Sequence, residues 1–276
     1  MDDRFKRFPA YLAERTRIVR LGPDNSVPTL LAHPDWRTPA PTVIWLHGRT
    51  VNKELDPGRY LRWIRAGIAA CAIDLPGHGE RADAAMQEPA RTLDVLDQVQ
   101  REIDQVIESL ADPHYGGLFD LDRLAIGGMS AGGMATLRRL CEPHPFVCAT
   151  VEATTGNLAG LYAGAPGRPW PVSHPPERVA ALDPMQHLAG FRPIALLALH
   201  TEADAVVPID VQRTFLARLR AHYAVQGADP DMIEFRTWPE TGAPLEHNGF
   251  GRHANDAKNT QLEFLRRHLR PSAPAA

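Results

Sequence analysis

Short runs of consecutive apolar residues alternate along the chain with stretches that have helical spacing. The runs cover residues 42–46, 68–73, 124–126, 146–151 and 194–199. Because their apolarity is continuous, we expect strands that are covered on both faces, as in a parallel sheet between helices. Apolar positions spaced by three and four residues predict helices near residues 60–64, 93–110, 131–141, 209–224 and 257–269. The alternation predicts an α/β fold with a mostly parallel sheet.

Three further segments bring the predicted sheet to roughly eight strands with helices on both faces. Residues 15–21 and 28–33 flank Gly22-Pro23-Asp24-Asn25 and predict an antiparallel hairpin at one edge. Residues 233–238 predict the last strand. We expect a single domain over residues 1–276. Residues 155–192 interrupt the pattern with many prolines and glycines and predict a small cap insertion, and residues 271–276 predict a flexible tail.

Composition and charge narrow the class of protein. Hydrophobic residues make up 44% of the chain, which is enough to bury a core without disulfides or a structural metal. A formal net charge of −3 gives no electrostatic reason to expect nucleic acid as a partner. The three cysteines form no CxxC pair, and the chain has neither a signal-peptide pattern nor an apolar stretch of membrane-spanning length. We therefore expect a cytoplasmic protein that binds neither nucleic acid nor membranes.

The sequence Gly128-Met129-Ser130-Ala131-Gly132 lies between a predicted strand and a predicted helix. A serine on such a sharp turn takes strained backbone geometry, and side chains two positions to either side would collide. The turn lifts the hydroxyl clear of the sheet and places the next N–H groups at a helix start, where they favour negative charge. Chance predicts roughly 0.03 such motifs at this glycine content. We therefore interpret Ser130 as a nucleophile and not as an idle serine in a structural turn.

Four segments together resemble the α/β-hydrolase superfamily, and the resemblance covers about residues 15–270. They are Leu46-His47-Gly48, Asp74-Leu75-Pro76-Gly77-His78-Gly79, the turn around Ser130, and a late Asp and His. The stretch His247-Asn248-Gly249-Phe250 is most similar to dienelactone-hydrolase and prolyl-oligopeptidase-like esterases, although relatives often read His-Gly-Phe and Asn248 is an addition. The resemblance implies the α/β-hydrolase fold, with the cap over the active-site end of the sheet.

A serine hydroxyl becomes nucleophilic when an imidazole takes its proton and a carboxylate holds the tautomer of that imidazole. The resemblance implies that acid and histidine follow the serine in this order. Asp204 comes after a predicted strand in an Asp-x-x-Val-Pro pattern that matches the usual loop of the superfamily, so we expect it to be the acid. Glu202 in the same loop and Glu152 after residues 146–151 are the alternatives.

His247 and His253 both lie between the last predicted strand and the last predicted helix. We favour His247 as the base and keep His253 as the alternative. His78 comes too early in the chain for this role, and we interpret its glycine-flanked motif as a tight turn. The remaining histidines show no ligand spacing, so we expect no metal site.

Acyl transfer places negative charge on the carbonyl oxygen, and two backbone N–H groups can stabilise it. The resemblance implies that these belong to Arg49 and Ala131, after His47-Gly48 and after the nucleophile. The side chain of Arg49 or of Lys53 either contacts a carboxylate on the substrate or is a solvent-facing loop cation.

These residues predict a serine hydrolase that cleaves carboxylic esters through an acyl-enzyme. Its partner would be a small-molecule ester, and the reaction would need no cofactor. Two alternatives stay open: a serine peptidase of the prolyl-oligopeptidase type, and a catalytically inactive hydrolase fold that serves as a small-molecule receptor. The sequence leaves the oligomeric state open.

Overall fold

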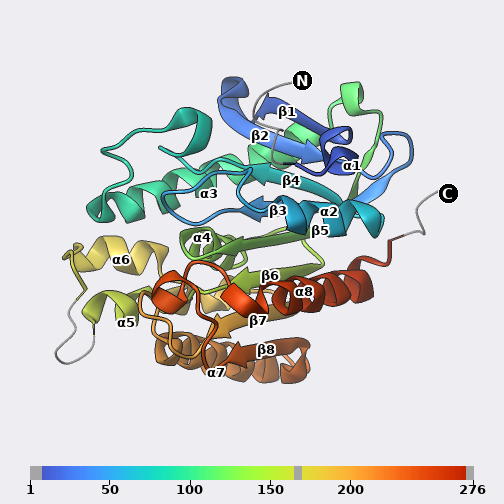
Figure 1. Ribbon diagram of the computed structural model, residues 1–276. Helices are drawn as coiled ribbons and strands as arrows, with labels where there is room; N and C mark the ends of the chain where they lie inside the picture. The colour runs from blue at the N-terminus through green and yellow to red at the C-terminus, as the bar shows by residue number, and fades with distance from the viewer. Residues whose placement is uncertain (1–7, 165–169, 272–276) are drawn as a thin grey trace.

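The computed structural model describes residues 8–164 and 170–271. Eight strands form one sheet in these residues, in the order β1-β2-β4-β3-β5-β6-β7-β8 (Figure 1). Their bounds are β1 Thr16–Leu21, β2 Val27–Ala32, β3 Ala40–Leu46, β4 Ala69–Ile73, β5 Phe119–Met129, β6 Cys148–Glu152, β7 Ala195–Thr201 and β8 Ile233–Trp238. Each predicted strand is present, and β5 extends beyond its apolar run of residues 124–126 at both ends.

Strands β3 to β8 run parallel to one another, and β1 and β2 form one edge of the sheet. β1 pairs with β2 antiparallel, and β2 pairs with β4 antiparallel. The predicted edge hairpin is therefore confirmed. β3 lies between β4 and β5, and its Ile44 pairs with Cys71 on β4 and with Ile126 on β5. The carboxyl ends of β3, β5, β6 and β7 consequently lie at the same end of the sheet.

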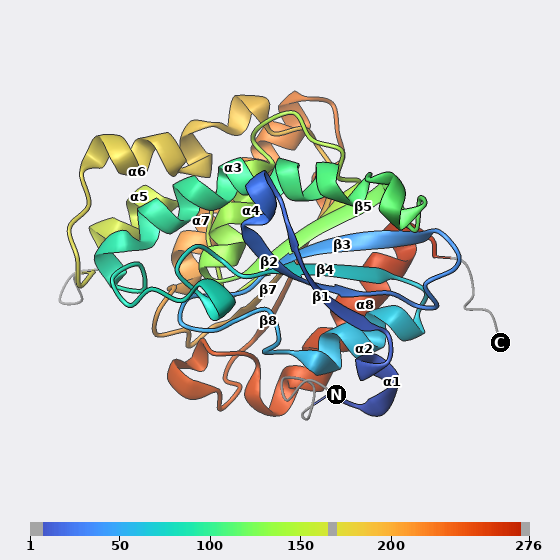
Figure 2. The same cartoon turned by 90° about the horizontal axis from the view of Figure 1, so that it is seen from above.

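The α-helices cover the sheet on both faces. Their bounds are α1 Ala10–Ala13, α2 Pro57–Arg65, α3 Thr92–Leu110, α4 Ala131–Arg139, α5 Leu158–Ala163, α6 Pro176–Leu182, α7 Ile209–Val225 and α8 Ala254–Leu269. Figure 2 shows α3, α4 and α7 on one side of the sheet and α1, α2 and α8 on the other. Two apolar clusters follow this division, because successive side chains of a strand point to opposite faces. On β3, for example, Ile44 packs in one cluster and Val43 in the other.

The segment predicted as a cap, residues 155–192, contains α5 and α6, which pack against each other. It is therefore more regular than its sequence indicates. Asn157 begins α5 by accepting a hydrogen bond from the Gly160 N–H, and the buried Asp183 accepts from the Leu158 and Ala159 N–H groups. These side chains stabilise the start of α5, whose sequence has little apolar periodicity. Part of the cap, like the predicted tail beyond residue 271, lies outside the described residues.

None of the helices in residues 8–164 and 170–271 is long and apolar enough to cross a membrane.

Candidate active site

Ser130 occupies a strained turn between β5 and α4. Its φ of 51° and ψ of −119° lie in a region that residues other than glycine rarely adopt. The end of β6 holds both of its backbone groups: the Ser130 N–H donates to the Glu152 carbonyl at 2.9 Å, and the Thr154 hydroxyl donates to the Ser130 carbonyl at 2.7 Å. The strained serine geometry expected from the motif is confirmed.

The glycines on either side of Ser130 are required by close backbone approach. A Cβ atom added to Gly128 would lie 2.5 Å from the carbonyl carbon of Gly132. A Cβ added to Gly132 would lie 2.2 Å from the carbonyl oxygen of Leu46, at the end of β3. Both distances are shorter than real Cβ contacts, so a larger residue would force the backbone apart. The collisions predicted for these positions are thus explained by contacts with α4 and β3.

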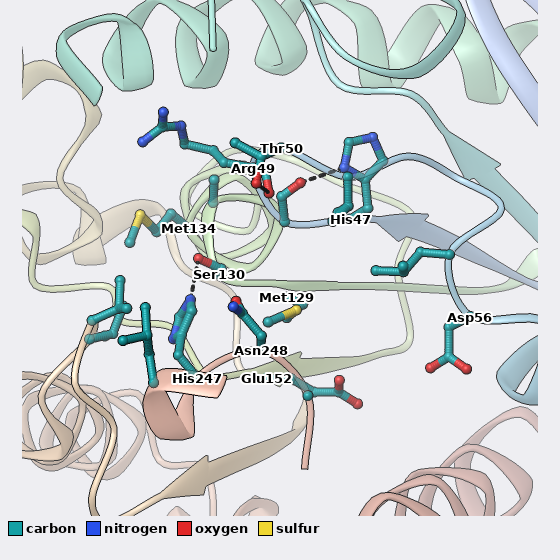
Figure 3. A pocket seen from close by; sticks show the side chains of 18 of the residues that line it. His47, Arg49, Thr50, Asp56, Met129, Ser130, Met134, Glu152, His247 and Asn248 are labelled. Atoms are coloured by element: carbon teal, nitrogen blue, oxygen red, sulfur yellow. Dashed lines mark hydrogen bonds between the residues drawn. The ribbon is translucent and has the colours of Figure 1, made fainter. Parts of the chain in front are cut away.

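The structure brings Asp204 and His247 to Ser130 in one chain of hydrogen bonds. Figure 3 shows the contact between His247 and Ser130. His247 Nε2 lies 2.9 Å from the Ser130 hydroxyl, and His247 Nδ1 lies 2.8 Å from Asp204 Oδ2. Because a carboxylate only accepts, the imidazole proton belongs on Nδ1, and Nε2 is free to accept from the hydroxyl. Asp204 Oδ1 accepts the N–H groups of Val206 and Val207, each at 2.8 Å, which fixes the carboxylate plane.

The alternative acids and the alternative base lie elsewhere. Glu202 has an exposed side chain that accepts a hydrogen bond from Thr237. Glu152 is buried and accepts two hydrogen bonds from the Arg59 guanidinium, at 2.6 and 2.8 Å. The ring of His253 packs against Trp238 with centroids 6.2 Å apart. The hydrogen-bonded side chains are therefore those of Ser130, His247 and Asp204. The side chains of Glu202, Glu152 and His253 take no part in this chain.

An irregular loop presents His247 to the serine. Leu245 and Glu246 both have positive φ, at 56° and 52°, although neither is glycine. The Glu246 carboxylate holds this conformation by accepting hydrogen bonds from the backbone N–H and hydroxyl of Thr241, both at 2.6 Å. The Ala205 N–H donates to the Leu245 carbonyl at 2.9 Å, so the histidine loop is tied directly to the loop that carries the acid.

Arg49 and Ala131 belong to the two segments that lie beside the nucleophile. An added Cβ on Gly48 would lie 3.5 Å from the Ser130 Cβ, so the loop after β3 runs beside the serine. His47 Nδ1 donates to the Gly48 carbonyl at 2.6 Å and so holds that peptide. Across a trans peptide the Arg49 N–H points away from the Gly48 carbonyl. Ala131 is the first residue of α4, where an N–H has no acceptor within the helix.

The second glycine motif supports this loop from behind. The His47 Nε2 accepts the Leu75 N–H at 3.0 Å, and the His78 ring lies 5.6 Å from the His47 ring. His78 is buried and donates from Nδ1 to the Pro76 carbonyl at 2.7 Å. The prediction of a structural turn is confirmed.

Lys53 does not line the site. Its side chain is buried, and its ammonium group contacts Asp74 at 2.8 Å, Glu80 at 2.6 Å and Glu54 at 3.0 Å. The hypothesis that Lys53 contacts a substrate carboxylate is therefore wrong, because three acidic side chains already surround its charge. Arg49, in contrast, lines the cavity over Ser130.

That cavity has a volume of about 640 Å³ and extends to both sides of the serine. Arg49 lies at one end together with Tyr162 and Trp170 from the predicted cap. At the other end Arg59 pairs with Glu152. Burial alone would lower the pKa of Arg59, but the Glu152 carboxylate outweighs this effect, and the pKa is raised above its ordinary value. Sequence reasoning missed this pair because its members are 93 positions apart and carry no motif. The apolar side chains that line the cavity include Trp45, Met129, Val207 and Phe250.

Within the described ranges, no cluster of three or more His, Cys, Asp or Glu side chains could hold a metal ion. The three cysteines are buried and unpaired.

Comparisons with known proteins agree with this architecture. The sequence profile of the prolyl oligopeptidase family matches residues 60–272. Esterase YjfP of Escherichia coli is 27% identical over 262 residues, which cover 88% of this chain and 96% of that esterase. The family match and this relative identify the α/β-hydrolase superfamily.

Solved structures with low sequence identity show the same fold. TT1662 from Thermus thermophilus has a TM-score of 0.69 at 22% identity, covering 92% of this chain and 98% of that one. The acylaminoacyl peptidase of Pyrococcus horikoshii has a TM-score of 0.71 at 18% identity. Its match covers 95% of this chain but only 43% of the peptidase, so this chain spans less than half the length of that protein.

Proposed function

The chain belongs to the prolyl oligopeptidase family and is a serine hydrolase of the α/β-hydrolase kind, and we propose that it cleaves carboxylic esters through an acyl-enzyme on Ser130. The observation that carries the proposal is the chain of hydrogen bonds from Asp204 through His247 to the Ser130 hydroxyl, at 2.8 and 2.9 Å. A serine so activated attacks an acyl carbon.

The reaction begins when the Ser130 oxygen bonds to the ester carbonyl carbon while its proton passes to His247 Nε2. The carboxylate of Asp204 stabilises the imidazolium that results. The tetrahedral intermediate then collapses, the bond to the alcohol oxygen breaks, and His247 gives its proton to the leaving alcohol. Water repeats these steps on the acyl-enzyme and releases the carboxylic acid with free Ser130.

The N–H groups of Arg49 and Ala131 are the proposed donors to the oxyanion. They come from the loop after β3 and from the start of α4, which meet beside Ser130. Removal of one such donor in other serine hydrolases costs about 3–4 kcal/mol of transition-state stabilisation. Because the His47 ring holds the Gly48–Arg49 peptide, we expect the geometry of the Arg49 donor to depend on His47.

Peptide cleavage is the second candidate, because the family includes peptidases with the same fold. One observation favours esters: the relative named an esterase matches 88% of this chain and is itself covered to 96%. The substrate we propose is a small-molecule ester, and the proposed location is the cytoplasm, where three free cysteines remain reduced.

A test combines covalent labelling with turnover. We expect a fluorophosphonate to add one adduct to the intact protein, on Ser130, and Ser130→Ala to remove it. We expect the enzyme to turn over p-nitrophenyl butyrate with a higher kcat/KM than a peptide p-nitroanilide. A higher kcat/KM for the anilide would instead establish the peptidase. Absence of the adduct would favour the inactive receptor and refute the proposal.

A further inference from the structure

Three side chains at the cap end of the cavity carry hydrogen-bond donors that have no acceptor among residues 8–164 and 170–271. They are Arg49 Nε, the Tyr162 hydroxyl and Trp170 Nε1, and each atom is buried from solvent. All three residues line the cavity that contains Ser130. Buried donors are nearly always paired in folded proteins, so these three are available to an acceptor that enters the cavity.

Contacts with neighbouring residues hold each of the three side chains. The rings of Tyr162 and Trp170 meet edge to face, with centroids 5.4 Å apart. The Arg49 guanidinium donates from Nη2 to the Gln87 carbonyl, and the Gln87 side chain donates to the Gly77 carbonyl at 2.8 Å. Figure 3 shows the guanidinium on the opposite side of Ser130 from Glu152 and Asp56. The guanidinium is therefore held in place before any ligand arrives.

Charge distinguishes this end of the cavity from the other. At the far end Arg59 pairs with Glu152 at 2.6 Å, and Lys258 pairs with Asp56 at 3.0 Å. No carboxylate in residues 8–164 and 170–271 lies within ion-pair distance of Arg49. The other charged side chains that line the cavity all form ion pairs, so Arg49 carries a charge that no partner balances. Burial lowers the pKa of Arg49, which the charge of Glu88 partly opposes, and such a desolvated cation gains most from an anion beside it.

Resting on the ester hydrolase function, we propose that Arg49, Tyr162 and Trp170 form a subsite for a carboxylate carried by the substrate. A carboxylate has two oxygens and about four lone-pair sites, which matches a cluster of donors that includes a cation. A neutral group would leave the guanidinium charge unbalanced. Burial raises the pKa of Tyr162, so its hydroxyl stays protonated and acts as a donor.

Matched substrates test the proposal from both sides of the scissile bond. Monomethyl glutarate and methyl 5-oxohexanoate have the same shape, but only the first carries a carboxylate, and it lies on the acyl part. Acetoxyacetate and acetoxyacetone form the same contrast on the alcohol part. We expect kcat/KM for the anionic member to exceed that of the neutral member at least tenfold in one pair, which also identifies the part that lies under the cap.

Two variants and one control connect this preference to the subsite. We expect Arg49→Gln to reduce the anionic-to-neutral ratio at least tenfold and Tyr162→Phe to reduce it several-fold, since the ratio cancels effects on the oxyanion donors. Arg101→Gln removes an exposed charge on α3 that pairs with Asp97, and it should leave the ratio unchanged. A second readout needs no turnover: glutarate should slow fluorophosphonate labelling of the wild type more than that of Arg49→Gln.

The outcomes separate this inference from the function on which it rests. Labelling of Ser130 without a preference for the anionic ester in either pair, and without protection by glutarate, would overturn the subsite alone. An unchanged ratio in both variants would overturn it as well. Failure to label Ser130 would refute the hydrolase and the subsite together.

Discussion

Replacement of Asp204 by asparagine tests whether this carboxylate orients His247. Asp204 Oδ1 accepts two N–H groups at 2.8 Å each, so the oxygen of an asparagine must remain at that position. Its NH₂ group would then face His247 Nδ1, where the carboxylate accepts a proton at 2.8 Å. To avoid two opposed donors, the imidazole must place its proton on Nε2. That nitrogen could no longer take the proton of Ser130.

We expect Asp204→Asn to lower kcat about 10⁴-fold, the loss seen when the equivalent exchange is made in a serine protease. At 1.36 kcal/mol per decade, this corresponds to about 5.4 kcal/mol of activation free energy. The assay is hydrolysis of p-nitrophenyl butyrate, followed at the same enzyme concentration for each variant. Thermal unfolding should change little, because the asparagine oxygen keeps both backbone hydrogen bonds.

Glu152→Gln is the matched control, because it makes the same exchange at the end of the neighbouring strand. Glu152 and Arg59 are both buried, at 2% and 5% exposure, so loss of one charge should cost about 3 kcal/mol of unfolding free energy. This corresponds to a midpoint lower by roughly 6–12 °C in a protein of this size. The folded variant should keep kcat within about tenfold. If Glu152→Gln abolished activity while Asp204→Asn retained it, Glu152 would be the acid and the reasoning would be wrong.

Three further predictions concern stability. Gly132→Ala should lower the unfolding free energy by about 2–3 kcal/mol in urea titrations, because its Cβ would lie 2.2 Å from the Leu46 carbonyl oxygen; an unchanged midpoint would contradict this. Lys53→Met should cost about 3–5 kcal/mol by the same assay, because it leaves the fully buried Asp74 without its cation, and it should not alter the anionic-to-neutral ester ratio. The protein should lose stability as the pH falls from 7.5 to 5, by at most about 1.4 kcal/mol per pH unit for each unmatched proton. Burial lowers the pKa of several histidines, so the unfolded chain binds protons that the folded chain refuses, and stability is lost as the pH falls through the unfolded value of about 6.5. We assign this effect to the fully buried His33, His78 and His200. Urea midpoints that stay constant or rise towards pH 5 would contradict its sign.

Most of the fold could be predicted because its strands are buried on both faces. A short run of consecutive apolar residues such as 42–46 is typical of a strand that is buried on both faces. The helical stripe predicted at 93–110 matches α3 at Thr92–Leu110 within one residue. The strand order could not be read in the same way. The antiparallel pairing of β2 with β4 depends on which edges meet after the chain collapses, and backbone hydrogen bonds between strands carry no sequence signature.

The cap and the far end of the cavity were harder to predict for a different reason. Asp183 binds N–H groups at Leu158 and Ala159, about 25 positions away, and thereby orders α5. Arg59 reaches Glu152 across 93 positions. Polar contacts of this kind join single residues from distant segments, so no local pattern announces them. The unpaired donors of Tyr162 and Trp170 could be recognised only from the three-dimensional structure, because a sequence does not show which polar atoms lack a partner.

The nucleophile was easier to identify than the base. The strained backbone at Ser130 leaves room only for glycine two positions to either side, whereas the hydrogen bonds that position His247 can be made by many residue types. Ser130 holds a φ of 51°, which costs of order 1–3 kcal/mol and persists only where glycines let β3 and α4 approach. Those glycines leave a motif in the sequence. His247 requires only a loop that ends 2.9 Å from the hydroxyl, and Glu246 and Thr241 achieve this with hydrogen bonds that many side chains could make. A histidine six positions later could fit the same sequence context, so the choice between the two depended on the backbone of that loop.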